Sequence, residues 1–139
     1  MAIRDKLMWT LTALFAGRVG AQALQTWRPI AALPPEAAFH GSELPYPLLL
    51  AAQLLILALM LRVSWRAHRG YLAPDPRRSR ILAWCGGVYM ALALTRLALG
   101  LAWAGAPPWF RAWIPDLFHP VLAGFVLCWA GCHRGRTTP

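Results

Sequence analysis

Four blocks of apolar residues recur along the chain, separated by shorter segments rich in polar residues and proline. The blocks cover residues 8–27, 48–65, 81–103 and 117–132. A transmembrane helix needs about 20 mostly apolar residues to cross a hydrocarbon core of ~30 Å. The pattern therefore predicts an all-α integral membrane protein, an antiparallel four-helix transmembrane bundle that forms a single domain over residues 1–139.

Basic residues gather at alternate ends of these blocks. Two precede the first block, six lie around the segment between the second and third, and two follow the fourth. They are Arg4, Lys6, Arg62, Arg66, Arg69, Arg77, Arg78, Arg80, Arg134 and Arg136. Cytoplasmic loops of membrane proteins carry an excess of Lys and Arg, so both termini and the middle loop are predicted to be cytoplasmic, as in a bacterial-type inner membrane. The net charge of +9 is thus explained without a nucleic-acid partner.

The eight tryptophans support the same topology. Amphipathic indole rings prefer the headgroup level of a bilayer, where they form aromatic belts. Trp9, Trp65, Trp84 and Trp129 would mark the cytoplasmic interface. The outer interface would carry Trp27, Trp103, Trp109 and Trp113.

The N-terminus permits a second interpretation. Arg4 and Lys6, the apolar run 7–17 and Ala21-Gln22-Ala23 together resemble a cleavable secretory signal. The apolar pattern resumes after Arg18, which favours a retained first span. Cleavage would leave three spans in the same orientation.

The second outer loop carries an aromatic and aliphatic stripe at helical spacing. Its members are Trp109, Phe110, Trp113, Ile114, Leu117 and Phe118. This spacing predicts a short interfacial helix that leads into the fourth span. It would anchor the loop in the headgroup region or, alternatively, cover the outer end of the bundle as a lid.

Arg18 and Arg96 are the most informative residues, because each lies inside an apolar block that contains no acidic residue. A charged side chain at membrane depth is costly and usually faces the bundle interior, a watery cavity or a partner. Gln22 shares a helix face with Arg18, and Tyr89 shares one with Arg96. We expect these faces to meet in the outer half of the bundle.

The candidate ligand-binding set combines these side chains with polar residues of the outer loops. It comprises Arg18, Gln22, Gln53, Tyr89, Arg96, His40, Glu43, Asp116 and His119. Arginine stays charged and offers several fixed donors, which suits an anionic headgroup, a carboxylate or a quinone carbonyl. Alternatively, the two arginines only bond to helix carbonyls or to loop carboxylates such as Glu36, or one of them snorkels to the headgroups.

Residue type alone suggests two further ligand sets. Cys85, Cys128 and Cys132 lie toward the predicted cytoplasmic end and offer soft ligands to a thiophilic metal, although the usual metal-ligand spacings are absent. Free cysteine is ordinarily a small buried hydrophobe. His119 with His40 would be the pair for a haem, but no histidine lies at mid-span.

The sequence contains no catalytic motif, so we expect a non-catalytic accessory or scaffold subunit. Such a subunit would dock to a larger membrane assembly or to itself, and the leucine-rich second block would face lipid or that partner. The alternative is a binding, transport or enzyme module for an amphipathic anionic lipid or quinone-like ligand, held near Arg18 and Arg96. No cofactor is predicted beyond such a bound lipid or quinone.

Overall fold

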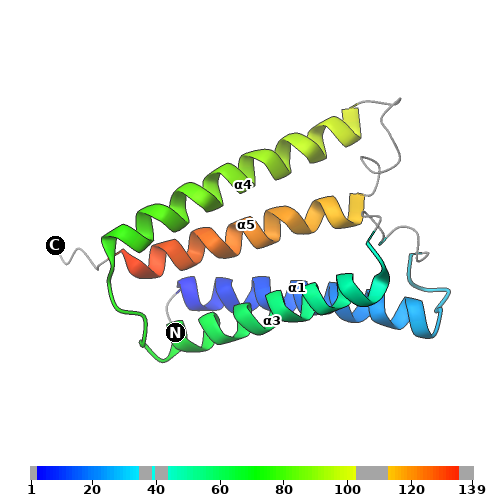
Figure 1. Cartoon of the computed structure of the whole chain (residues 1–139), viewed down its shortest axis with the longest axis horizontal. Coiled ribbons are helices and arrows are strands. Elements are labelled where there is room, and N and C mark those ends of the chain that lie inside the picture. Colours follow the sequence, from blue (N-terminus) through cyan, green and yellow to red (C-terminus); the bar gives the residue numbers. More distant parts are fainter. Residues whose placement is uncertain (1–2, 35–38, 40–43, 103–112, 135–139) are drawn as a thin grey trace.

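The computed structural model describes residues 3–34, 39, 44–102 and 113–134, and most of them belong to four α-helices (Figure 1). The helices are α1 (Ile3–Trp27), α3 (Tyr46–His68), α4 (Pro76–Ala102) and α5 (Trp113–His133). No strand occurs in the described ranges. The predicted all-α class is therefore confirmed.

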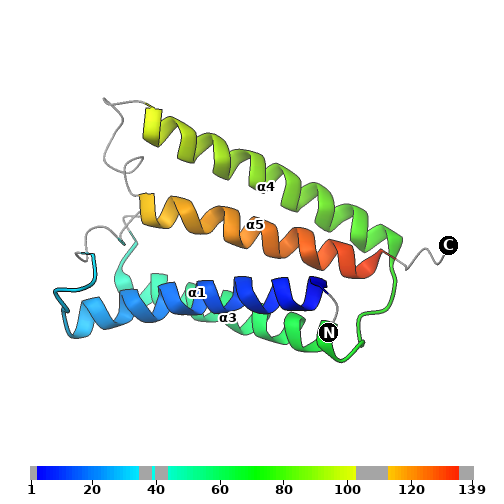
Figure 2. The ribbon, with the colours of Figure 1, turned by 180° about the vertical axis from the view of Figure 1, so that it is seen from behind.

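The helices lie side by side and alternate in direction, as both ribbon views show (Figures 1 and 2). Helices α1 and α4 begin, and α3 and α5 end, at the side of the molecule that holds the turn between α3 and α4. We call this side, around residues 69–75, the turn end. The opposite side, where α1 and α4 end and α3 and α5 begin, is the cavity end.

Three of the helices are long and apolar enough to cross a membrane, namely α3, α4 and the stretch Ile114–His133 of α5. They indicate a membrane-embedded protein. Helix α1 contains the predicted first span but is not among the three, because Arg18, Gln22 and Gln25 interrupt its apolar run. The four-span topology stays a prediction.

The apolar blocks located the helices to within a few residues. Helix α1 starts at Ile3 and α4 at Pro76, five residues before the predicted spans, because helical hydrogen bonding continues through charged residues. Helix α5 starts at Trp113 rather than at residue 117, so the last four members of the predicted interfacial stripe belong to α5 itself. Trp109 and Phe110, its first two members, lie outside the described residues.

The apolar core lies between α1, α3 and α5. Its buried members are Met8, Phe15, Val19, Met60, Val63 and Phe125. Helix α4 packs against α5 and buries few of its own residues. Gly86 makes this packing possible, because a Cβ atom there would lie 3.0 Å from the Leu127 side chain.

The turn end is closed by a regular helix cap on either side of the α3–α4 connection. At the end of α3, Tyr71 N–H donates to the Arg66 carbonyl and Gly70, with a φ of 71°, supplies the left-handed residue that this cap requires. At the start of α4, Asp75 accepts hydrogen bonds from the amides of Arg77 and Arg78, both at 3.0 Å. These amides would otherwise lack helical partners.

The last carbonyls of α5 also find partners from other segments at the turn end. The Ser79 hydroxyl donates to the Ala130 carbonyl at 2.9 Å, and the Arg4 guanidinium donates to that of Gly131. The Asp75 amide donates to the His133 carbonyl at 3.0 Å. The final turn of α5 is thereby tied to α1, to α4 and to the connection that precedes α4.

Candidate functional site: a cavity shared by four helices

A cavity of about 190 Å³ lies toward the cavity end, and all four helices contribute to its wall. Its polar wall residues are Arg18 from α1, Gln53 from α3, Arg96 from α4 and His119 from α5. The remaining wall residues are apolar: Phe15, Phe39, Leu49, Ala52, Ile56, Pro115, Phe118 and Leu122. Four polar side chains therefore converge on a small apolar-walled space.

Arg96 is paired with a carboxylate from the neighbouring helix. Its Nε atom lies 2.8 Å from Oδ1 of Asp116, whose side chain is only 1% exposed. A buried carboxylate is tolerated when a cation lies beside it. Asp116 comes from the first turn of α5, so the loop carboxylate expected from the sequence reaches Arg96 from within a helix. This contact agrees with the alternative in which Arg96 pairs with a carboxylate of the protein rather than with a ligand.

Arg18 has a different environment. Its guanidinium carbon lies 5.4 Å from the ring centroid of Phe118, which is a cation–π distance. Its Nε atom is buried and has no hydrogen-bond partner in the described parts of the chain. Glu36 and Glu43, the acidic partners suggested by the sequence, lie outside those parts. An aromatic face attracts a cation but is only a weak hydrogen-bond acceptor, so the Nε–H group of Arg18 has no strong acceptor in these segments.

Gln22 and Gln53 form an interhelical pair beside the cavity. Nε2 of Gln53 donates to Oε1 of Gln22 at 3.0 Å, and both side chains are buried. The other polar atom of each amide, Nε2 of Gln22 and Oε1 of Gln53, has no partner among the described residues. Turning both amides over leaves the same result, one unpartnered N–H group and one unpartnered carbonyl.

His119 is held by the helix opposite. Its Nδ1 atom lies 2.7 Å from the hydroxyl of Tyr89, and the two rings meet edge to face at 5.9 Å. Tyr89 is thus a neighbour of the cavity wall through His119. Pro120 follows His119 within α5 and has no amide hydrogen for the carbonyl of Asp116, one turn earlier.

The structure thus brings most of the predicted ligand-binding residues together. Arg18, Gln53, Arg96 and His119 line the cavity. A direct polar contact links each of the other three to that wall: Gln22 to Gln53, Tyr89 to His119 and Asp116 to Arg96. His40 and Glu43 lie outside the described residues, so their place in the site stays a prediction, as does the haem pair that includes His40.

The apolar walls were not recognised from the sequence. The helical spacing predicts that Phe118 belongs to the interfacial stripe, but its ring contacts Arg18. Phe15 lies three residues before Arg18 on the same helix face and lines the same cavity. That spacing was the available signal for an aromatic wall beside the arginine.

The thiols are not brought together. Cys85 is exposed on α4, whereas Cys128 and Cys132 are partly buried on α5, and Cys132 lies 3.7 Å from the sulfur of Met8. The ranges that the structure describes contain no group of three or more Cys, His, Asp or Glu residues able to hold a metal ion. Cys128 and Cys132 pack against the apolar core.

No protein-family model, curated protein or solved structure shows a match to this chain. The site is therefore interpreted from its own geometry and chemistry.

Proposed function

We propose that this chain is a small four-span inner-membrane protein that binds the polar end of an amphipathic ligand in the four-helix cavity. The ligand class is an anionic lipid or a quinone-like molecule, both of which present oxygen acceptors on an apolar body. One observation carries the proposal: Arg18, whose buried Nε has no acceptor in the described parts of the chain, lines the same apolar-walled cavity as Arg96.

The chemistry of the wall favours an acceptor-bearing group. Guanidinium groups stay charged and donate several hydrogen bonds in a fixed plane. Arg96 already forms a salt bridge with Asp116, whereas the buried Nε of Arg18 has no acceptor in the described segments. A buried donor without a partner is costly, and a bound oxygen would remove that cost.

The size of the cavity limits what it would enclose. Pockets that surround a drug-sized molecule measure about 300–1,000 Å³. A cavity of about 190 Å³ would therefore hold a headgroup or a ring, with the ligand's tail running between the helices or along their lipid-facing surface. Phe15, Phe118 and Leu122 would contact the apolar part nearest the headgroup.

The proposed topology is an antiparallel bundle of four spans with both termini cytoplasmic. Its support is the cluster of basic residues at the turn end, where the positive-inside rule would place the cytoplasm. Trp9, Trp65, Trp84 and Trp129 also belong to helix segments near that end. The cavity would then open in the outer half of the membrane.

The proposal is tested by single Arg18→Gln and Arg96→Gln substitutions, with Arg28→Gln as the control because Arg28 is exposed beyond the end of α1. Native mass spectrometry of protein extracted in mild detergent reports both oligomeric state and retained small molecules. We expect Arg18→Gln to reduce retention of one species by about tenfold or more, the value of one charge-assisted hydrogen bond, with assembly unchanged. Wild-type protein that is folded but retains nothing would contradict the proposal.

The second candidate is the accessory or scaffold role, in which the chain docks to a larger membrane assembly or to itself. The observation in its favour is the exposure of α4, on which Trp84 is 71% exposed and Leu92 and Leu101 are also open. A partner helix would cover this surface in place of lipid. Loss of assembly in Arg18→Gln or Arg96→Gln, with retained molecules unchanged, would favour this candidate over ligand binding.

A further inference from the structure

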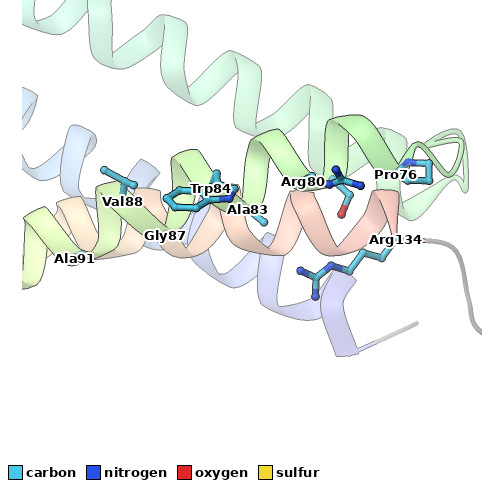
Figure 3. A pocket seen from close by; sticks show the side chains of 9 residues that line it. Pro76, Arg80, Ala83, Trp84, Gly87, Val88, Ala91 and Arg134 are labelled. Carbon is cyan, nitrogen blue, oxygen red and sulfur yellow. The ribbon is translucent and has the colours of Figure 1, made fainter.

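A second concave region lies far from the cavity, along the turn-end half of α4. It is a surface groove of about 880 Å³ (Figure 3). The groove is lined by Pro76, Ser79, Arg80, Ala83, Trp84, Gly87, Val88, Ala91 and Arg134. It shares no residue with the four-helix cavity, so its ligand would be a separate one.

The mouth of the groove is cationic. Arg80 projects from the start of α4 and Arg134 from just beyond α5, and Figure 3 shows both near the turn end of the groove. Both residues are exposed, and neither forms a salt bridge within the described part of the chain. Asp75, the acidic residue of the neighbouring turn, is paired with Arg78 at 3.0 Å. The two arginines therefore give the mouth of the groove a positive charge that no salt bridge in these segments offsets.

Apart from Ser79, whose hydroxyl donates to the Ala130 carbonyl, the rest of the groove is lined by small or apolar residues. Ala83, Gly87 and Ala91 recur every four residues and so follow one face of α4. A Cβ atom at Gly87 would meet nothing within 4 Å, which shows that the space above this glycine is open. Trp84 and Val88 stand beside this face, further from the mouth than Arg80 (Figure 3).

The length of the groove fits one leaflet of a bilayer. Eleven residues separate Arg80 from Ala91, which is about 16 Å along a helix at 1.5 Å per residue. Half of a ~30 Å hydrocarbon core is about 15 Å. A cationic mouth at the headgroup level would thus continue into an apolar track as deep as one acyl leaflet.

We infer that this groove binds an anionic glycerophospholipid of the leaflet at the turn end. Arg80 and Arg134 would hold its phosphate, and one acyl chain would lie along Ala83, Gly87 and Ala91. Basic pockets at the ends of transmembrane helices recognise anionic headgroups in this way. A partner helix would also fit the small residues, but it would leave two cations at the mouth without compensation, so charge complementarity favours the lipid.

The inference depends on a membrane-embedded α4 but not on any ligand of the four-helix cavity. The test is a lipid titration of the detergent-solubilised full chain, followed by native mass spectrometry. The probes are dioleoyl phosphatidylglycerol, which is anionic, and dioleoyl phosphatidylcholine, which is zwitterionic with the same acyl chains. Wild-type protein should bind the anionic probe about tenfold or more tightly than the zwitterionic one.

The charge is tested with the double variant Arg80→Gln/Arg134→Gln. Its affinity for phosphatidylglycerol should fall about tenfold or more. The matched control is Arg66→Gln/Arg77→Gln, which removes two charges from the same end of the molecule without touching the groove. The control should stay within about twofold of wild type. An equal loss in both double variants would show diffuse attraction to the basic end and would overturn the inference.

The shape is tested with Gly87→Leu, which adds bulk to the groove at a position where a Cβ atom would meet nothing within 4 Å. Its melting temperature should match that of wild type, while its affinity for phosphatidylglycerol should fall several-fold. If Gly87→Leu instead dissociates a dimer that phosphatidylglycerol does not displace, the groove holds a second copy of the chain and the lipid assignment is wrong.

Discussion

The two ends of this helix assembly treat buried polar groups differently. At the turn end, the carbonyls of Ala130, Gly131 and His133 each accept a hydrogen bond from another segment. At the cavity end, Arg18 and the Gln22–Gln53 pair retain buried atoms that have no partner in the described parts of the chain. Both ends are built by the same four helices.

The difference indicates where the chain completes its own structure and where it leaves donors and acceptors for something else. Lipid tails cannot hydrogen-bond, so a membrane protein must satisfy its buried polar groups internally or with a ligand. The turn end satisfies the carbonyls that end α5 internally, and the indole N–H of Trp129 is the buried exception there among the described residues. The cavity end satisfies its buried polar groups internally only in part, through Arg96 with Asp116 and Tyr89 with His119.

The ion pair at the cavity end should produce the largest effect. Asp116→Asn leaves Arg96 facing a neutral amide, and breaking a buried pair from one side costs about 3 kcal/mol. We expect a correspondingly lower unfolding midpoint in detergent. Because the partners are coupled, Arg96→Gln/Asp116→Asn should lose less stability than the sum of the two single variants. Strict additivity would show that the pair contributes no mutual stabilisation.

The α4–α5 contact between the ends should produce the next largest effect. Gly86→Ala places a methyl group 3.0 Å from Leu127, and overpacking of this kind costs about 2 kcal/mol. Gly87→Ala is the control, because its Cβ meets nothing within 4 Å. Thermal unfolding of both variants measures the difference. Equal unfolding midpoints of the two variants would mean that α4 is not closely packed on α5. The contrast between the two ends would then result from loose packing of α4.

Two interhelical polar pairs between α1 and α3 should respond with opposite sign. Thr12 and Ser64, nearer the turn end, share a hydrogen bond of 3.2 Å, so Ser64→Ala should lower stability by about 0.6 kcal/mol. Gln22→Leu/Gln53→Leu removes a hydrogen bond together with two unpartnered atoms, so stability should stay level or rise slightly. A clear loss of stability in both cases, measured by thermal unfolding, would contradict the contrast between the ends.

The smallest effect concerns Asp75 at the turn end. Hydrogen bonds from the Arg78 and Arg77 amides and the charge of Arg78 lower the pKa of the Asp75 carboxyl below its usual 3.8. Its stabilising contribution is therefore complete above about pH 4 and is lost as the pH falls through the lowered pKa. Asp75→Asn should show a slightly smaller drop in melting temperature than wild type between pH 7 and pH 3. Identical drops in melting temperature would show that Asp75 does not contribute to the loss of stability at low pH.

The sequence located the helices and the site region because both depend on local pattern. Apolar blocks of sufficient length gave four helices, and Arg18 and Arg96 stood out as charges within such blocks. The sequence did not predict which side chains of different helices make contact, since this depends on the rotation of one helix against another. The apolar pattern predicts a loop at Asp116, yet this residue pairs with Arg96 from the first turn of α5.

The roles of the two arginines also needed the three-dimensional arrangement. The sequence presented them as an equivalent pair, but Arg96 faces a carboxylate and Arg18 faces the ring of Phe118. Likewise, Tyr89 and His119 were both candidates, but their direct hydrogen bond follows from the packing of α4 on α5. Long-range contacts of this kind leave no periodicity in the sequence.

The central claim, that the cavity holds a ligand, is tested most directly by filling it without altering a charge. Ala52→Leu adds bulk to the cavity wall, and Ala51→Leu adds the same bulk to the neighbouring exposed position outside it. Native mass spectrometry should show that Ala52→Leu loses the small molecule that wild type and Ala51→Leu retain, with all three chains equally assembled. Equal retention by Ala52→Leu and Ala51→Leu would show that the molecule lies elsewhere and would contradict the claim.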